Sequence, residues 1–394
     1  MQNIFDGVKV VDFTMNTAGP YSTVMLADFG AEVIKIEKPK LGDDQRNYSP
    51  QLDGTAVGFF WGNRGKKSIV LDMDDPQGVE IAKKLIETAD VVAESFKPGT
   101  MAKFGLSYED VKKINPKVIY CSVSAYGQTG PMKSKPGYDM IAQALSGVMD
   151  LTGEPGGPPT RLGIVLADCS AGAHAFGAIA SALYHRERTG QGQQIDIALL
   201  DSIVAFNAYV EHNAAGNYVR RSGNNPLTLA PFGVFQGKEG FAVICAPNVK
   251  LWAALCNVMQ RPDLIDDTEF NTVVARIKNL PQMIKLIEDW LKTFDDIDAP
   301  LAQLDKVGVP CAKINTTRDL FTNEQLLSRE MIVENATHKG TPLKMKGNPL
   351  KFSAVKANNN RPPALGQNQD EVLKSLGYSD EAIADIKAKW SIRD

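Results

Sequence analysis

Cysteine and histidine are scarce in this sequence, and neither is spaced to hold a metal ion or a disulfide framework. The 394 residues include 5 Cys and 4 His, and no two cysteines form a C-x-x-C pair. An odd number of cysteines in a chain of this length indicates reduced thiols and a cytoplasmic protein. The histidines at 174, 185, 212 and 338 are not paired at zinc-ligand spacing. The sequence therefore predicts no metal site.

Long hydrophobic runs and an excess of charge of one sign are also missing. The longest stretch of small and apolar residues, 171–184, is too short to span about 30 Å of hydrocarbon. The N-terminus has no basic region followed by an apolar stretch, so no secretory signal is expected. The 43 Lys+Arg residues against 46 Asp+Glu give a net charge of -3, which argues against nonspecific binding of nucleic acid. We expect no membrane anchor and no nucleic-acid partner.

Several catalytic signatures are absent as well. The chain contains no G-x-x-x-x-G-K-[ST], no G-x-S-x-G and no H-E-x-x-H. The nearest dinucleotide fingerprint, at 189–194, lacks its third glycine and follows a predicted helix instead of a strand. These absences argue against a P-loop enzyme, an α/β-hydrolase, a zinc peptidase and a nicotinamide dehydrogenase.

Apolar side chains, by contrast, are plentiful and regularly patterned. Hydrophobic residues make up 43% of the chain and charged residues 23%, which excludes a disordered chain. Over residues 1–120, short β-branched runs alternate with helical patterns, as is typical of an α/β fold with a parallel sheet. We predict helices capped by Asp75 and Ser107, and strands at 8–13, 33–36, 68–71, 91–93 and 118–123.

The remainder of the chain predicts a second, smaller domain, for which 394 residues leave room. We expect a helix over 170–188, a strand over 194–198, and a long helical stretch ending near Asn217. After the turn signals of 222–226 come predicted strands at 233–236 and 241–245 and helices at 251–259 and 280–294. The Gly- and Pro-rich residues 126–163 are either a linker or loops shaped for a ligand.

Asp168 is the candidate for chemistry that stands out from the local pattern. It ends an apolar run and opens a helix of small residues, so the simple interpretation is a helix N-cap. An ionised carboxylate at the positive end of a helix can also act as a nucleophile, and the two interpretations are compatible. His174 and His185 lie on the same predicted helix and are interpreted as packed or surface residues.

Two further features permit a phosphate-bearing ligand. The first predicted strand is followed by residues 14–20 and then by a helix that begins near Tyr21, an arrangement that presents backbone N–H groups to anions. Lysines recur near predicted strand ends, although a solvated surface explains them more simply. These lysines are Lys38, Lys66, Lys67, Lys97, Lys103, Lys133 and Lys135.

Short motifs along the whole chain, taken in order, resemble those of the class III CoA-transferases, the family of formyl-CoA transferase and carnitine CoA-transferase. The motifs are V-x-D-F-x(4)-A-G-P at 10–20, GAEVIKIE at 30–37, KSIVLD at 67–72, ESFKPG at 94–99, GQTGP at 127–131, PGYD at 136–139, AD at 167–168 with Gly172, RTGQGQ at 188–193, and P-x-L-G at 363–366.

The resemblance implies an enzyme that moves CoA from an acyl-CoA thioester to a free carboxylic acid, with coenzyme A as substrate and no tightly bound cofactor. Asp168 would be the nucleophile, forming an acyl anhydride and then a CoA thioester. Asp139 would orient the acyl end. The CoA contacts would be Thr17, Ala18, Lys38, Leu71, Asp72, Met73, Asp74, Ser95, Phe96, Lys97, Lys103, Lys135, Pro136, Gly137 and Tyr138.

The resemblance also implies an interlocked homodimer. Each chain would form a Rossmann-like large domain from 1–200, completed by a C-terminal segment, 346–394. A smaller α+β domain, 225–315, would lie between a linker at 201–224 and a return linker at 316–345. The region 227–240 has few of the glycines of formyl-CoA transferases, which favours a carboxylate pair other than formate and oxalate.

The chain departs from the family pattern in its CoA contacts, and two alternative functions stay open. Lys38 and Lys103 stand where relatives often carry arginine, so point charges replace a bidentate phosphate grip. An α-methylacyl-CoA racemase would need histidine where this chain has Tyr138, and a tyrosine with an ordinary pKa near 10 is a poor second base. A noncatalytic CoA-binding subunit would have lost its nucleophile, whereas Asp168 is intact.

Overall fold

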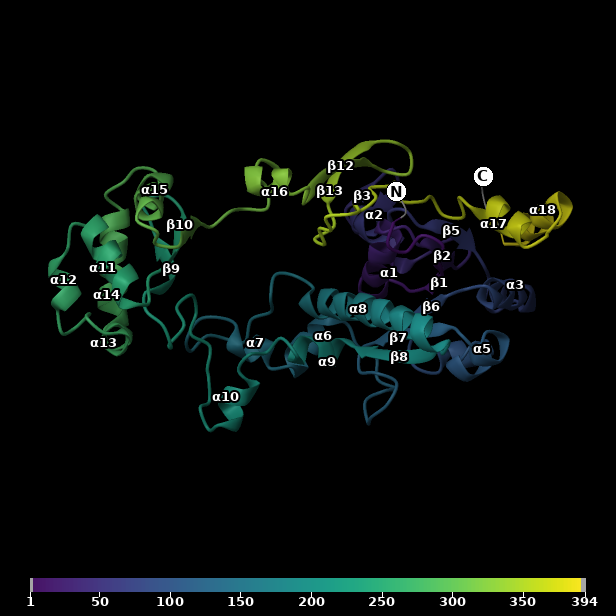
Figure 1. Cartoon of the computed structure of the whole chain (residues 1–394), viewed down its shortest axis with the longest axis horizontal. Coiled ribbons are helices and arrows are strands. Elements are labelled where there is room, and N and C mark those ends of the chain that lie inside the picture. The colour runs from purple at the N-terminus through teal and green to yellow at the C-terminus, as the bar shows by residue number, and fades with distance from the viewer. Residues whose placement is uncertain (1–2, 391–394) are drawn as a thin grey trace. The chain divides into compact units, whose positions relative to one another are not determined.

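The computed structural model describes residues 3–390, and the contacts within it divide the chain into two compact units. Unit 1 comprises residues 1–148, 161–210 and 324–394, and unit 2 comprises 149–160 and 211–323. Residues 1–2 and 391–394, where the predicted large domain begins and the predicted C-terminal segment ends, lie outside the described residues. Figure 1 labels the elements of both units.

Unit 1 is built on a six-stranded parallel sheet with the order β5-β2-β1-β6-β7-β8. Counted along the chain, these six strands stand in the order 3-2-1-4-5-6, the order of doubly wound sheets that bind ligands at their carboxyl ends. The strands are β1 Lys9–Phe13, β2 Glu32–Glu37, β5 Lys67–Val70, β6 Val91–Glu94, β7 Ile119–Ser124 and β8 Gln193–Ala198. Each lies within one residue of its predicted bounds, so the α/β prediction is confirmed.

Helices cover both faces of this sheet because its strands alternate two sets of buried side chains. Val10 lies in register beside Val33 and Val91, and all three pack toward α1 and α8. Val11 and Phe13 point to the opposite layer. Figure 1 shows α8 beside α1 and β7. The helices of the two layers are α1 Ala18–Asp28, α3 Pro76–Glu87, α5 Tyr108–Ile114, α8 Leu166–Thr189, α9 Leu199–Val204, α17 Gln369–Ser375 and α18 Asp380–Lys389.

Shorter elements complete unit 1 and connect the two units. A pair of short strands follows β2, and a second antiparallel pair lies in the segment predicted as the return linker. These elements are η1 Asp44–Asn47, β3 Gln51–Leu52, β4 Thr55–Ala56, α2 Val57–Asn63, α4 Thr100–Lys103, α6 Asp139–Leu145, α7 Val148–Leu151, α10 Val210–Ala214, η2 Asp319–Phe321, α16 Glu324–Ser328, β12 Ile332–Ala336 and β13 Pro342–Lys346.

The C-terminal segment packs onto the edge strand of the sheet. The Gln369 side chain accepts a hydrogen bond from the Val70 N–H at 2.7 Å and donates to the Val70 carbonyl at 3.1 Å. The Ser68 hydroxyl accepts from the Gly366 N–H at 3.0 Å. Side chains from the end of the chain thus satisfy backbone groups that an edge strand would otherwise expose.

Several helix predictions are confirmed and others need correction. Asp75 and Ser107 cap α3 and α5 as predicted. Helix α1 begins at Ala18 instead of near Tyr21, because Pro20 falls in the first turn, where its missing N–H costs nothing. The long helix predicted to end near Asn217 is two short helices, α9 and α10. Between them the Asn207 amide bonds the Ser146 carbonyl and the Tyr209 N–H, which competes with helical bonding.

Unit 2 combines a three-stranded antiparallel sheet, in the order β11-β10-β9, with several helices. The Arg276 side chain is fully buried and donates to the carbonyls of Ala230, Phe270 and Pro247 at 2.6, 2.6 and 2.7 Å. The elements are β9 Phe232–Gln236, β10 Phe241–Cys245, β11 Cys311–Lys313, α11 Val249–Val258, α12 Asp263–Asp266, α13 Val273–Lys278, α14 Leu280–Leu291 and α15 Asp298–Lys306. Across residues 3–390, no helix has both the length and the hydropathy needed to cross a bilayer.

The close approach of α8 to α1 depends on Gly172. A Cβ atom at Gly172 would lie 2.7 Å from the Ala18 carbonyl oxygen and 3.0 Å from the Tyr21 Cβ. The nearer of these atoms belongs to the backbone, so it cannot move away as a flexible side chain would. On the same helix, a Cβ atom at Gly177 would meet nothing within 4 Å.

We therefore expect Gly172→Ala and Gly177→Ala to act in opposite directions. The first should destabilise the protein by roughly 1–3 kcal/mol through overpacking against α1. The second should be neutral or stabilise by up to about 1 kcal/mol, because alanine is the better helix former. Denaturant unfolding of both variants checks this, and equal midpoints would show that α8 does not depend on Gly172.

Candidate active site

Asp168 lies in the first turn of α8. The helix begins at Leu166 with Val165 as its N-cap, so the prediction that Asp168 is the N-cap is wrong by three positions. The reason is that the cap is supplied from elsewhere in the sequence, by Asp139 at the start of α6. Asp168 retains the position expected of a nucleophile at a helix N-terminus.

The Asp139 carboxylate closes the free end of α8. Its Oδ1 accepts the N–H groups of Ala167 at 2.7 Å and of Asp168 at 3.3 Å. Its Oδ2 accepts from the Gln143 side chain at 2.6 Å. Gln143 in turn accepts the Leu162 N–H at 2.9 Å, which holds the loop that leads into α8. Asp139 is thus a buried positioning residue for the backbone that carries Asp168.

Burial, together with the negative charge of Asp139, raises the pKa of Asp168 to about 7. We predicted that the helix end would keep Asp168 ionised, so this expectation needs correction. Desolvation and a neighbouring like charge outweigh the helix dipole. The carboxyl of Asp168 therefore changes its charge near neutral pH, a property that is common at catalytic sites.

A cavity of about 190 Å³ opens at the carboxyl ends of β1, β2, β5 and β6. Six of the residues predicted to contact CoA line it: Lys38, Leu71, Asp72, Met73, Asp74 and Phe96. Met73 and Asp74 also line an adjoining hollow, which includes the predicted Lys103. The structure thus brings together predicted residues from the loops after β2, β5 and β6 and from α4.

Three more predicted residues, Ser95, Thr17 and Ala18, do not line this cavity but contact or form the segment that leads from β1 into α1. The Ser95 hydroxyl accepts the N–H of Met15, a lining residue, at 2.8 Å. The Thr17 hydroxyl accepts from the Gln45 side chain at 3.4 Å, and Ala18 is the buried first residue of α1. These residues fix the loop between β1 and α1.

The remaining predicted CoA contacts do not line the cavity or its adjoining hollow. Lys97, Lys135, Pro136 and Tyr138 are exposed on loops, and 71% of Tyr138 is accessible. Gly137 has a structural constraint of its own, because a Cβ atom there would lie 2.7 Å from the Ala125 Cβ. The segment 135–138 therefore lies on the surface, and its backbone packs closely against Ala125 at Gly137.

Sequence analysis missed a set of buried ion pairs that supports the cavity. They join Lys35 to Asp43 at 2.9 Å, Lys66 to Asp12 at 3.0 Å, and Arg46 to Glu37 at 2.7 Å. All six side chains are buried. Their signal was present in the motifs at 10–20 and 30–37, but nothing in the sequence showed which charges would pair.

These ion pairs tie the loops around the cavity to the sheet. The Lys35 ammonium also donates to the Thr14 carbonyl at 2.7 Å, and Asp43 accepts the Asn16 N–H at 3.0 Å. Burial opposes ionisation of Asp12, but the Lys66 and Lys35 ammonium groups hold its pKa at about 2. The network is therefore charged at neutral pH and holds the loop after β1 against the loop after β2.

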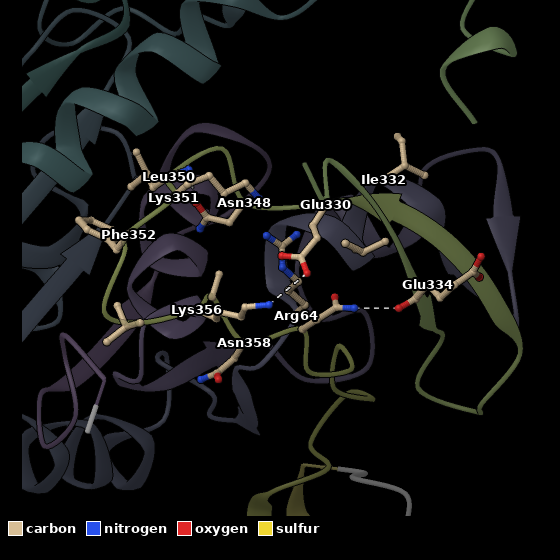
Figure 2. Close-up of a pocket in the computed structure, with 15 residues that line it drawn as sticks. Arg64, Glu330, Ile332, Glu334, Asn348, Leu350, Lys351, Phe352, Lys356 and Asn358 are labelled. Carbon is tan, nitrogen blue, oxygen red and sulfur yellow. Dashed lines mark hydrogen bonds and ion pairs between the residues drawn. The ribbon is translucent and has the colours of Figure 1, made fainter. Parts of the chain in front are cut away.

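A second cavity in unit 1, of about 430 Å³, was not predicted from the sequence. Figure 2 shows that it lies between Arg64 and residues of the segment 330–359. The Lys356 ammonium is directed at the Glu330 carboxylate (Figure 2). These two groups lie 3.5 Å apart, and Arg64 is bound to Asp28. The three named charges are thus already paired within the chain. Among residues 3–390, no group of three or more Cys, His, Asp or Glu could hold a metal ion.

Comparison with known proteins decides the family. Residues 5–369 match the sequence profile of CoA-transferase family III. The chain belongs to this family. It is 36% identical over 406 residues to human succinyl-CoA:glutarate CoA-transferase, an alignment that covers 98% of this chain and 90% of the relative. It is 40% identical over 367 residues to acetyl-CoA:oxalate CoA-transferase of Acetobacter aceti, with 91% and 92% covered.

The solved structures agree with this family III assignment. A crystal structure of a CAIB/BAIF family protein from Brucella suis matches with a TM-score of 0.86 at 37% identity. The match covers 95% of this chain and 100% of that protein. The predicted family and class are confirmed: this is a class III CoA-transferase that acts on acyl-CoA thioesters.

The position of Asp168 in this family III enzyme predicts a pH dependence. The expected role of Asp168 as nucleophile requires its ionised form, so single-turnover release of CoA should rise with pH through a midpoint near the Asp168 pKa of about 7. Asp139→Asn removes the adjacent negative charge, while its remaining oxygen can still accept the Ala167 N–H. The midpoint should therefore move to lower pH.

Asp201→Asn is the matched control, because Asp201 is an exposed carboxylate in the first turn of another helix, α9. Its midpoint should equal that of the unmodified enzyme. An Asp139→Asn profile with an unchanged midpoint would contradict the electrostatic coupling of Asp139 to Asp168.

Proposed function

We propose that this enzyme transfers CoA between dicarboxylic acids through covalent intermediates on Asp168. The observation that carries the proposal is the N-terminus of α8, where Asp139 holds the Asp168 backbone and where the Asp168 carboxyl titrates near neutral pH. The names of the human and Acetobacter relatives support the substrate class, since glutarate and oxalate are both dicarboxylic acids. The prediction that the pair is not formate and oxalate stays a prediction.

The proposed reaction has four displacement steps and no net proton transfer. An Asp168 carboxylate oxygen bonds to the thioester carbonyl carbon, the C–S bond breaks, and CoA leaves as a thiolate. The thiolate then attacks the Asp168 carbonyl carbon of this anhydride, and the donor acid leaves as a carboxylate. The acceptor carboxylate displaces CoA from Asp168 to form a second anhydride. The thiolate finally attacks the acceptor carbonyl carbon, which gives the new acyl-CoA and frees Asp168.

The proposed CoA site is the cavity at the carboxyl ends of the strands. Leu71–Asp74 and Phe96 would contact the adenine end, and Lys38 and Lys103 would meet phosphates as point charges. Lys97 and the surface segment 135–138 would complete the site when CoA is bound. Coenzyme A is a substrate in this scheme, and no tightly bound cofactor is invoked.

The finer architecture that the family resemblance implies is also a proposal. We infer an interlocked homodimer of cytoplasmic location, with a Rossmann-like large domain from 1–200 and 346–394 and a small α+β domain over 225–315. The parallel sheet of unit 1 and the separate antiparallel sheet of unit 2 support this division.

Covalent chemistry at Asp168 is tested by trapping. When the enzyme is incubated with acyl-CoA thioesters and hydroxylamine, we expect an aspartyl hydroxamate on the peptide that contains Asp168, read by mass spectrometry. Asp168→Ala should lose both the adduct and transfer, with CoA affinity retained. Asp201→Ala, which removes an exposed first-turn carboxylate of α9, should behave like the unmodified enzyme. Full transfer activity in Asp168→Ala would refute the assignment.

The phosphate role of Lys38 is tested by kinetics. Lys38 lines the cavity, is about half exposed and forms an ion pair with Asp44. Lys38→Ala should raise KM for acyl-CoA roughly three- to tenfold and change kcat less, because it removes one charge-assisted contact. Lys113→Ala is the control, since Lys113 forms a similar exposed pair with Asp110 away from the cavity. A loss confined to kcat would contradict a phosphate contact.

A further inference from the structure

The Lys346 ammonium, at the end of β13, lies over an aromatic ring. It lies 3.6 Å from the centre of the Trp61 ring, at the end of α2. Its neighbour Met345 is buried against Phe59 and Phe60, which fixes β13 on α2. The lysine therefore stands over the tryptophan because the strand beneath it is anchored in a small hydrophobic core.

A buried arginine holds this arrangement from below. Arg64 donates to the Trp61 carbonyl at 3.2 Å and to the Lys346 carbonyl at 3.0 Å. The remaining guanidinium nitrogens bind both carboxylate oxygens of Asp28. Arg64, labelled in Figure 2, thus locks two chain segments that are 282 residues apart in sequence. These bonds fix the backbone from which the Lys346 side chain projects.

A chain of contacts leads from Lys346 to the first turns of α8 within unit 1. The Trp61 ring packs edge-on against Tyr21 at 5.3 Å, and Tyr21 lies against Gly172 of α8. Gly172 is one helical turn beyond Asp168, on the same face of α8. Cys169, the residue after Asp168, interacts electrostatically with both Asp168 and Lys346. The ammonium and the proposed nucleophile are therefore linked through Trp61, Tyr21 and Gly172, and both lie near Cys169.

Lys346 differs from the cations around it in having no anion as partner. Arg64 is bound to Asp28, Lys66 to Asp12, and Lys344 on the same strand to Glu334. In the described part of the chain, Lys346 forms no ion pair. Burial and the nearby Arg64 guanidinium lower its pKa. The residue is also exposed on one side, so an external anion can reach it. A positioned, partly desolvated and unpaired cation favours a carboxylate ligand.

We propose that Lys346 binds the distal carboxylate of a dicarboxylic substrate whose other carboxyl group reacts at Asp168. This inference rests on the proposed function and deepens it, because it names the residue that selects diacids over monoacids. Trp61 supports the ammonium and excludes water from one side, and Arg64 fixes the position of both. Lys346 is thus a specificity residue and takes no part in bond making or breaking.

The experiment compares acceptors that differ only in the distal carboxylate. With one acyl-CoA donor held constant, kcat/KM is measured for succinate against butyrate and for glutarate against valerate. In Lys346→Met, which keeps an apolar side chain over Trp61, the diacid-to-monoacid ratio should fall roughly 10- to 100-fold, mainly through KM for the diacid. Lys346→Arg should restore most of the ratio. CoA affinity should be unchanged in both variants, which shows that each is folded.

Lys344→Met is the matched control, because it removes an exposed cation from the same strand and should leave the ratio unchanged. If Lys346→Met retains the diacid-to-monoacid ratio of the unmodified enzyme, the inference is overturned while the proposed function stands. If the unmodified enzyme transfers CoA only to monoacids, both the dicarboxylate proposal and the inference are overturned.

Discussion

The hydrogen bonds between the Asp139 carboxylate and the first turn of α8 are the contacts on which the site depends. They supply partners for the Ala167 and Asp168 N–H groups, which no residue within the helix can satisfy. They also place a second negative charge beside Asp168, so the group that positions the proposed nucleophile also makes its ionisation harder. The nucleophilic role proposed for Asp168 benefits from this conflict, because a carboxylate of higher pKa is a stronger base and a better nucleophile once it is ionised.

The parallel sheet positions the loops that form the proposed CoA site. Parallel strands end at one edge, and the loops that leave this edge form the cavity proposed for CoA. Buried ion pairs from β1 and β2 hold two of these loops, which would otherwise present charged side chains to each other across an apolar interior. Breaking such a pair leaves a buried charge without a partner, so the arrangement is rigid even though its net contribution to stability is small.

The C-terminal part of the chain, from residue 324 onward, belongs to unit 1 and packs on its N-terminal part. Met345 packs on α2, Arg64 clamps the end of β13, and Gln369 pairs with the edge strand β5. These contacts connect the last part of the chain to residues in its first seventy. The segment that carries Lys346 is therefore held in place by residues from the first part of the sequence.

The sequence by itself determined the local elements and the family. Strand positions follow from runs of β-branched residues, and the caps at Asp75 and Ser107 follow from side chains that bond their own backbone. The order of short motifs was enough to identify the CoA-transferases and to single out Asp168.

Only the tertiary structure decided how these elements meet. It showed that Asp139 caps α8, that six buried charges pair beneath the cavity, and that Lys346 stands over Trp61 without an anion. The prediction of Asp168 as an N-cap failed for the same reason, since the true partner of the helix end lies on α6. Local periodicity reflects hydrogen bonding between near neighbours in the chain. The pairing of charges, the pKa of a buried carboxyl and the support of a cation by a ring depend on which distant segments fold together.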